Sequence, residues 1–456
     1  MRKYANTVRH FTFIPTVARL RLALCAPVWH CSSIETATPS SSAPAATAAA
    51  ASAADGQAVP RAAHQAVLQA LELYDRHVGE VPAHGNEALH LRGMLALLLS
   101  AAFEPAVRSL RTIDDLSLCP DIQVIVGVPR VARSTLSDAM AKFDPAALNP
   151  VIGALKKQLP QLQRFDPHTA QLVGKILAGD GSWFNLAGQF DHALHCARGN
   201  KGRQCRVRLN LQLDVDGFCP DTFDVSGKAD GSEAAAFARN IQPDSIYLLD
   251  RNFVNFSFLN AVLAGKSHFV VRLKKKVNFT VSRSSALCDE DSKHGVLRDE
   301  VGTLSGPASA GNQDARACSA KPPARSLRRV TVFDENKQQE VELLTDLLDV
   351  PAFVIGILYR LRWQIELYFR WLKVLAGFRH LVSQSENGVR MQFYIGVLMA
   401  LLIHVQTGRR VSKYALIWVG WLNSGRGTPE AMAQALARHD RERENERKRR
   451  AAKKTS

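Results

Sequence analysis

Residues 359–373 read YRLRWQIELYFRWLK, and four polar side chains recur through this stretch: Tyr359, Arg362, Glu366 and Lys373. Each residue of an α-helix advances by about 100°, so residues seven apart return to within about 20° of the same direction. The spacing therefore predicts a helix with Tyr359, Glu366 and Lys373 in one narrow stripe. A single carboxylate would then lie between a tyrosine hydroxyl and two cations. Amphipathic helices with ion pairs between residues four apart have the same pattern, so this stretch alone leaves both interpretations open.

The composition favours a large, folded, basic protein. A chain of 456 residues that is 46% hydrophobic can supply a sizeable core in about two to four domains. The formal net charge of +16 favours a polyanionic partner, usually nucleic acid, although a basic protein from an arginine-rich proteome has the same balance. The eight cysteines include no CxxC pair and no zinc-ligand spacing, which indicates reduced thiols and a cytoplasmic location. No run of 18 uncharged apolar residues occurs, so no membrane span is predicted.

The first 58 residues differ from the rest of the chain. Residues 2–34 carry basic but no acidic side chains, which is typical of a transit peptide, an interrupted signal peptide or an unstructured leader. Residues 35–58 consist almost entirely of Ala, Ser, Thr and Pro and have little to bury. We therefore predict a disordered leader and linker over residues 1–58, with folded structure from about Val59.

Residues 59–165 have apolar side chains at helical spacing, which predicts a helical domain. Within it, the stretch VPRVARSTLSDAMAKF, residues 128–143, predicts a short helix capped by Ser134 or Thr135, with arginines just before it. Such a helix suits the second helix of a helix-turn-helix motif. A plain helical bundle explains the same pattern equally well.

From about residue 172 the hydrophobic period changes from that of helices to that of strands. One strand is predicted to end at Asp180, the next alternates over residues 205–216, and a third follows after a short turn. A helix, a strand ending at Asp250, a second helix and a fifth strand complete the segment. This order is typical of a ribonuclease-H-like core, so we expect an α/β (α+β) fold with a mixed five-stranded sheet over residues 166–276.

Three further segments complete the predicted organisation. Residues 277–348 are predicted as a β-rich insertion that includes a hairpin. Residues 349–405 contain the helix with Glu366 and a strongly apolar helix after it, and they are predicted to return to the core. Residues 406–456 form a C-terminal helical region with a basic tail. That tail is either a solvated helix or a non-specific phosphate-binding segment.

Three carboxylates carry the candidate chemistry: Asp180, Asp250 and Glu366. Carboxylates at the ends of adjacent strands repel each other and require a cation between them. Their hard oxygens suit Mg²⁺, and two such ions about 4 Å apart can activate an attacking oxygen and stabilise a leaving one. A single Asp after a strand is usually a turn residue, but two of them with a helical Glu favour metal-dependent phosphodiester chemistry.

These residues resemble a known family. The chain looks like a DDE transposase of insertion-sequence family four, whose signature is Y-(2)-R-(3)-E-(6)-K. Tyr359, Arg362, Glu366 and Lys373 fit that spacing, and the DGS block at Asp180 and the DRNF segment that begins at the second aspartate resemble the blocks of the first two catalytic aspartates. The segments LLTDLL and SENGVRMQ are also similar to the family's C-terminal block. The resemblance covers roughly residues 90–405.

The resemblance implies a cut-and-paste transposase. Asp180, Asp250 and Glu366 would be catalytic and would hold two Mg²⁺ or Mn²⁺ ions per site, while water frees a 3′-hydroxyl that later joins target DNA. Four residues would contact DNA: Tyr359, Arg362, Lys373 and Arg251. The implied partners are double-stranded DNA, as terminal inverted repeats and target, and a second copy of the chain in a homodimer. Neither a membrane nor a small-molecule cofactor is expected, and the chain would work at the bacterial nucleoid in the cytoplasm.

Several positions depart from the family pattern. The family usually has a glycine after the Asp-Arg pair of the second aspartate block, and Asn252 stands there in this chain. In the segment LLTDLL, Asp346 stands where Asn is expected. No Trp occurs between Asp250 and Tyr359, although a relative uses such a residue to trap a flipped base during hairpin formation. Two alternatives therefore stay open: an inactive or repurposed DNA-binding protein, and a metal-dependent nuclease that is indifferent to terminal repeats.

Overall fold

The computed structural model describes residues 63–79, 88–160, 166–187, 192–193, 197–199, 202–227, 232–274, 277–305, 321–335 and 337–455. The predicted leader and linker, residues 1–58, lie outside them. All the described residues belong to one compact unit, Gln57–Ser456.

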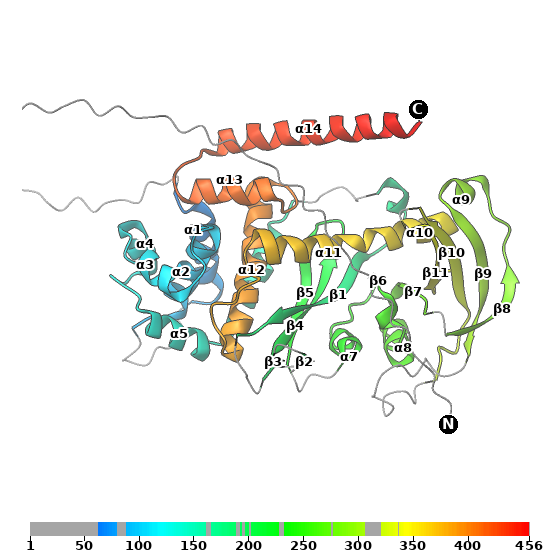
Figure 1. The fold of residues 1–456 in the computed structure, drawn as a ribbon, viewed down its shortest axis with the longest axis horizontal. Helices are drawn as coiled ribbons and strands as arrows, with labels where there is room; N and C mark the ends of the chain where they lie inside the picture. The colour runs from blue at the N-terminus through cyan, green and yellow to red at the C-terminus, as the bar shows by residue number, and fades with distance from the viewer. Residues whose placement is uncertain are drawn as a thin grey trace, which may run out of the picture. The chain divides into compact units, whose positions relative to one another are not determined.

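A nine-stranded mixed sheet forms the centre of this unit, in the order β5-β4-β1-β6-β7-β11-β10-β9-β8 (Figure 1). The strands are β1 (Lys175–Asn185), β4 (Arg206–Asp214), β5 (Cys219–Ser226), β6 (Ser245–Leu249), β7 (His268–Arg272), β8 (Asn278–Ser284), β9 (Val296–Ser305), β10 (Leu327–Asp334) and β11 (Gln339–Thr345). A separate pair contains β2 (Ala197–Gly199) and β3 (Gly202–Gln204). The fold is therefore mixed α/β, as predicted.

The five strands predicted for the core lie side by side at one end of this order. β1, β4 and β5 pair antiparallel, while β6 and β7 run parallel to β1. The prediction of a five-stranded sheet is nevertheless wrong, because β11 pairs with the free edge of β7 through residues 343–345. An edge strand presents unpaired N–H and C=O groups, and the inserted strands satisfy them by extending the sheet.

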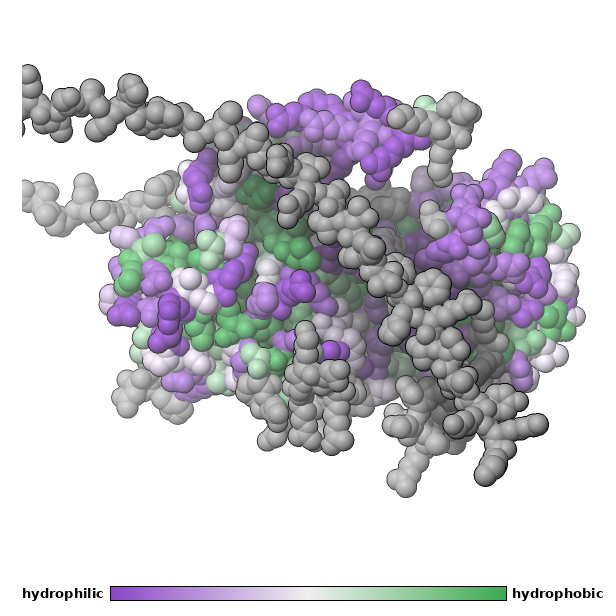
Figure 2. Space-filling model, viewed as in Figure 1, coloured by the Kyte–Doolittle hydropathy of each residue, from purple (hydrophilic) through white to green (hydrophobic). Residues whose placement is uncertain are grey.

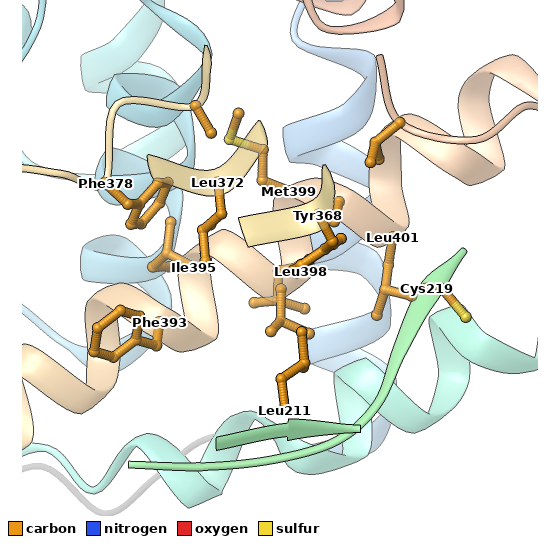
Figure 3. Packing of buried hydrophobic residues seen from close by; sticks show 14 of the residues in the cluster. Leu211, Cys219, Tyr368, Leu372, Phe378, Phe393, Ile395, Leu398, Met399 and Leu401 are labelled. Carbon is orange, nitrogen blue, oxygen red and sulfur yellow. The ribbon is translucent and has the colours of Figure 1, made fainter. Parts of the chain in front are cut away.

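Helices cover both faces of the core strands, and the alternation of side chains along each strand separates two hydrophobic clusters. Ile176 and Ala178 of β1 belong to the larger cluster, with α10 (Ala352–Leu361), α11 (Trp363–Arg370) and α12 (Glu386–Thr407). Leu177, between them, belongs to the smaller one, with α7 (Glu233–Ala238) and α8 (Phe256–Ala264). Figure 3 shows Tyr368 of α11 packed among residues of α12 and above Leu211 of β4.

The N-terminal region is helical, as the sequence predicts. Its helices are α1 (Gln65–His77), α2 (Leu91–Phe103), α3 (Leu110–Leu116), α4 (Pro120–Val126), α5 (Arg133–Lys142) and α6 (Asn149–Lys157). α1, α2, α5 and α6 all pack on α12. The predicted capping of α5 is wrong, because Ala132 is its N-cap and Ser134 and Thr135 lie inside its first turn.

Helix α12 is long and apolar enough to cross a membrane, but most of it is buried inside the protein. That burial is typical of a core helix. After it come α13 (Lys413–Asn423) and α14 (Pro429–Thr455). Met432, Ala435 and Leu436 near the start of α14 are buried, whereas residues 440–450 are exposed and form a hydrophilic surface at the top of the view (Figure 2).

Candidate active site

The stretch 359–373 is helical throughout but does not form one regular helix. Helix α10 ends at Leu361, α11 begins at Trp363, and residues Trp371–Leu375 form a π-helical turn, η4. The wider π-helical turn departs from the regular 3.6-residue repeat on which the predicted stripe rests. Leu361, Ile365 and Leu372 are buried against the core, so the apolar side of the stretch is as predicted.

Asp180 lies inside β1 and not at its end. The antiparallel pairing with β4 continues from Leu177 through to Asn185, whereas the parallel pairing with β6 stops at Gly179 opposite Leu249. The predicted end of the strand is therefore wrong, because β4 supplies partners beyond Asp180. Asp180 and Asp250 each come directly after the last parallel pair between β1 and β6. The two aspartates therefore follow the same end of this pair of strands.

Asp250 opens the short 3₁₀ turn η3 (Arg251–Phe253), and its Oδ1 accepts a hydrogen bond of 2.7 Å from the backbone N–H of Asn252. Asn252 is not among the described residues with positive φ. The turn therefore requires no glycine, and the departure from the family pattern at this position carries no backbone strain. Arg251 is exposed beside Asp250.

Asp180 lies within electrostatic reach of the two other predicted carboxylates. Burial and, to a smaller extent, the negative charges of Asp250 and Glu366 together raise the pKa of Asp180 to about 6, while Arg362 opposes them. Desolvation and like charges both disfavour an ionised carboxylate. Asp180 of β1 therefore experiences the charges of the loop after β6 and of α11.

Arg362 contacts both Glu366 and Tyr359. Nη2 of Arg362 donates a hydrogen bond of 2.5 Å to Oε1 of Glu366, and the guanidinium lies 5.8 Å from the centre of the Tyr359 ring. Burial raises the pKa of the Tyr359 hydroxyl, and Arg362 opposes that effect. In the structure, the arginine therefore supplies the positive charge next to Glu366.

Lys373 reaches the same strand as the first aspartate. Its Nζ donates a hydrogen bond of 2.8 Å to the carbonyl oxygen of Trp183 and lies 4.6 Å from the centre of the Phe184 ring. Burial lowers the pKa of Lys373, and the charge of Asp180 opposes this. The ammonium is thus held over β1, near Asp180.

Sequence reasoning missed one carboxylate of this site, Glu233. Burial and, to a smaller extent, the charges of Asp180 and Asp250 together raise its pKa to about 7, while Arg208 opposes them. Glu233 is the first residue of α7, where acidic residues are common because they favour the helix dipole. Its identity therefore carried no signal of its own.

A divalent cation is the group that such a set of oxygens would suit. In the part of the chain that the structure describes, no three His, Cys, Asp or Glu side chains are already grouped as a metal site. Glu366 is instead held by Arg362. A cation that bound to all three acids would have to replace that ion pair.

Comparison with known proteins agrees with this geometry. The family model described as "Transposase DDE domain" matches residues 172–403, slightly more than half of the chain. A putative transposase, y4zB of Sinorhizobium fredii, is 27% identical over 207 residues, which cover 45% of this chain and 55% of that protein. A probable transposase for the insertion sequence element IS5377, of Geobacillus stearothermophilus, is 21% identical over 205 residues, 44% of this chain and 50% of that protein.

The chain thus spans about half the length of these relatives. Among solved structures, a piggyBac transposase synaptic complex with hairpin DNA has a TM-score of 0.40 at 10% identity, over 82% of this chain and 79% of that one. The family match includes the strands and helices that bring Asp180, Asp250 and Glu366 together. The chain belongs to the family of transposases with a DDE domain.

Proposed function

We propose that the chain is a DNA transposase that cuts at the ends of an insertion sequence and transfers the cut strands into target DNA. The observation that carries the proposal is the placement of Asp180 and Asp250 directly after the last parallel pair of β1 and β6, with Asp180 in electrostatic reach of Asp250 and Glu366, in a chain with the DDE domain. The spacing of Tyr359, Arg362, Glu366 and Lys373 supports membership of insertion-sequence family four, and the strand order supports a ribonuclease-H-like core.

Asp180, Asp250 and Glu366 are the residues that would hold two Mg²⁺ or Mn²⁺ ions. Their oxygens fit such ions in chemistry, and the raised pKa of Asp180, caused first by burial and then by its acidic neighbours, is one that a bound cation would lower. When bound, the ions would activate water and stabilise the leaving oxygen of a phosphodiester. The protein would contribute the placement of the acids at one edge of a rigid sheet.

Three residues of the helical stretch would bind the DNA backbone. Arg362, released from Glu366, offers a planar pair of donors that matches a phosphate. Lys373 is held over β1 by the Trp183 carbonyl and offers a point charge beside Asp180. Tyr359 would add a hydroxyl, and Arg251 is exposed next to Asp250, where DNA would approach.

The partners follow from the chemistry proposed. Double-stranded DNA would enter as terminal repeats and as target, and two copies of the chain would be needed to bring two ends together. The helical region of residues 59–165 would recognise the repeats, with residues 128–143 as a helix-turn-helix candidate. The basic helix α14 would add sequence-independent contacts to phosphate. We expect the chain to act at the nucleoid, in the cytoplasm.

A second candidate is a repurposed DNA-binding protein without chemistry. The closed ion pair between Arg362 and Glu366 and the lack of a ready-made metal site in the described residues favour it. A third candidate is a metal-dependent nuclease that ignores terminal repeats, which the general chemistry of the site would also serve.

Cleavage of DNA that carries the terminal repeats of the chain's own element tests these candidates. We expect Mg²⁺-dependent nicking by the full chain and a loss of about 10³-fold or more in Glu366→Gln, because a ligand to the reacting centre is removed. Equal cutting by Glu366→Gln would refute the assignment. Repeat binding without cutting would favour the second candidate, and equal cutting of unrelated DNA the third.

A further inference from the structure

A groove lies between the N-terminal helices and the loop that follows the helical stretch of Glu366. Its volume is about 760 Å³, and its walls are the start of α3, the first turns of α5 and the loop 376–382 after η4. The described residues that line the groove include no acidic side chain. Three arginines and three serines provide its polar lining: Arg108, Arg111, Arg133, Ser109, Ser134 and Ser137.

Arg108 is fixed at the wall of this groove by the loop after η4. A Cβ on Gly377 would lie 2.6 Å from Nε of Arg108, and Gly377 has a φ of +82°. A residue without a side chain therefore both permits the turn and lets the guanidinium lie against it. Phe378, the next residue, is buried beside Ile395 of α12 (Figure 3). This contact anchors the loop and, with it, one wall of the groove.

The three arginines of the groove differ from a fourth arginine close by. The guanidinium of Arg130 binds the Asp114 carboxylate through hydrogen bonds of 3.0 Å and 3.3 Å. None of the three groove arginines forms an ion pair within the part of the chain that the structure describes. The charge of Asp114 also reaches Arg133, but Arg130 already occupies that carboxylate. The groove therefore carries positive charge without a matching acid in its lining.

Positive charge continues from the groove to the candidate active site. The N–H of Arg379, in the loop after η4, donates a hydrogen bond of 3.1 Å to the carbonyl oxygen of Lys373. Burial and, to a smaller extent, the charge of Arg379 lower the pKa of Lys373, while Asp180 opposes them. The exposed Arg379 thus lies near the ammonium that is held over β1. The same loop then runs on to the groove.

A polyanion with regularly spaced charges is the partner that this lining fits. Each phosphate of duplex DNA carries a negative charge, and a guanidinium binds a phosphate through two parallel hydrogen bonds. Such contacts fix the position of a protein on the duplex without reading its sequence. A free anion would neutralise one arginine, whereas a DNA backbone presents successive phosphates to all three and to the loop.

We propose that this groove binds the phosphate backbone of double-stranded DNA through its three arginines. Arg379 and Lys373 continue the contact from the groove toward the acids of the active site. The inference rests on the DNA binding of the proposed function and adds where the duplex lies between the N-terminal helices and the site. It also separates Arg130, which holds Asp114, from the arginines that bind DNA.

Salt-dependent binding of the full chain to a fluorescently labelled DNA duplex of arbitrary sequence tests the inference, by anisotropy without divalent cations. Each phosphate contact contributes about 0.9 to the slope of log K against log salt concentration. The slope should therefore fall by about 1 in Arg111→Gln and in Arg133→Gln, and by about 2 in the double variant. Arg76→Gln removes an exposed charge of α1 that does not line the groove and should leave the slope unchanged.

Ser134→Glu is a second variant that does not depend on removing an arginine. An acidic residue in the first turn favours helix α5, while its charge lies in the groove, so we expect a folded protein that binds the same duplex more weakly. Thermal unfolding verifies that every variant folds. Wild-type slope and affinity in the folded groove variants would overturn the inference, as would an equal loss of slope in Arg76→Gln.

Cleavage of terminal-repeat DNA by the wild type, measured alongside, separates this inference from the proposed function. If the wild type cuts with Mg²⁺ and the groove variants bind DNA as it does, the inference alone is wrong. If the groove variants lose slope and the wild type does not cut, the groove binds DNA and the proposed cleavage is wrong. A wild type that binds no duplex DNA removes both.

Discussion

The two halves of the sheet differ in how their acidic residues are paired. The core half contains β1, β4, β5, β6 and β7, and the inserted half contains β8, β9, β10 and β11. In the inserted half, Asp299 of β9 pairs with Arg328 of β10 at 2.7 Å and 2.8 Å, and both side chains are only 7% exposed. Arg328 also donates hydrogen bonds to the carbonyl oxygens of Leu347 and Leu348. Asp299 and Arg328 therefore neutralise each other and have hydrogen-bond partners, as buried ion pairs require.

At the site in the core half, by contrast, acidic side chains raise one another's pKa in spite of the cations nearby. Burial and like charges raise the pKa of Asp180 to about 6 and that of Glu233 to about 7. No described cluster of the inserted half has this property. The contrast indicates that the inserted half holds its acids in stabilising ion pairs, whereas the site in the core half holds buried acids at a cost to stability.

The largest effect that would test this contrast is expected for Asp180→Asn. The variant should lose about 10³-fold or more in DNA cleavage, since a proposed ligand is removed. It should nevertheless be about 1–2 kcal/mol more stable than wild type at pH 7 without divalent cations. The folded pKa exceeds the unfolded value, so ionisation of Asp180 costs the folded state free energy above the unfolded pKa.

Urea unfolding in the presence of a chelator measures that stability. If Asp180→Asn is less stable than wild type, the contrast between the two halves is wrong, because the Asp180 carboxylate would then stabilise the fold as Asp299 does.

Asp299→Asn is expected to have the opposite signature. Removing one partner of a buried ion pair should cost about 3 kcal/mol in the free energy of unfolding, because Arg328 is left buried without its counter-charge. The exposed pair between Arg298 and Glu340, at 2.8 Å, provides the control. Glu340→Gln should change stability by less than about 1 kcal/mol. Equal costs in the two variants would show that burial does not set the value of these pairs.

The same comparison explains what could be predicted from the sequence. Alternating apolar residues specified the five core strands, and the helical period placed Leu361, Ile365 and Leu372 on the buried side. The extension of the sheet could not be predicted, because it depends on which strand pairs with the free edge of β7. Asp180 was placed at a strand end for a similar reason, since β4 determines how far β1 continues.

Within the site, the limits have the same origin. Asp180, Asp250 and Glu366 were accessible to sequence reasoning because each follows a local pattern. Glu233 was not, because a glutamate in the first turn of a helix is ordinary and its proximity to Asp180 arises only when α7 packs across Gly181. The pairing of Glu366 with Arg362 was visible as a spacing, whereas the π-helical turn that carries Lys373 has no sequence signature.

The smallest effect is expected in a third region, the apolar core around α12. His404 in α12 is 1% exposed, and neither ring nitrogen has a hydrogen-bond partner in the described residues. Burial lowers its pKa to about 4, assisted by the positive charge of Arg410. This group avoids the cost of an unpaired buried charge by staying neutral at pH 7, whereas the acids of the site are held near one another.

Because the folded pKa of His404 lies below its unfolded value of about 6.5, the unfolded state binds the proton first as the pH falls. Stability should therefore decrease as the pH falls from about 6.5 towards 4, by roughly 2 kcal/mol between pH 7 and pH 5 for this residue. His404→Gln should remove that part of the acid sensitivity while Asp180→Asn leaves it in place. Urea unfolding at pH 7 and pH 5 measures the difference. If His404→Gln leaves the pH dependence of stability unchanged, the ring of His404 is solvated or hydrogen-bonded in solution. The apolar core around α12 would then accommodate a charge as readily as the site of the acids does.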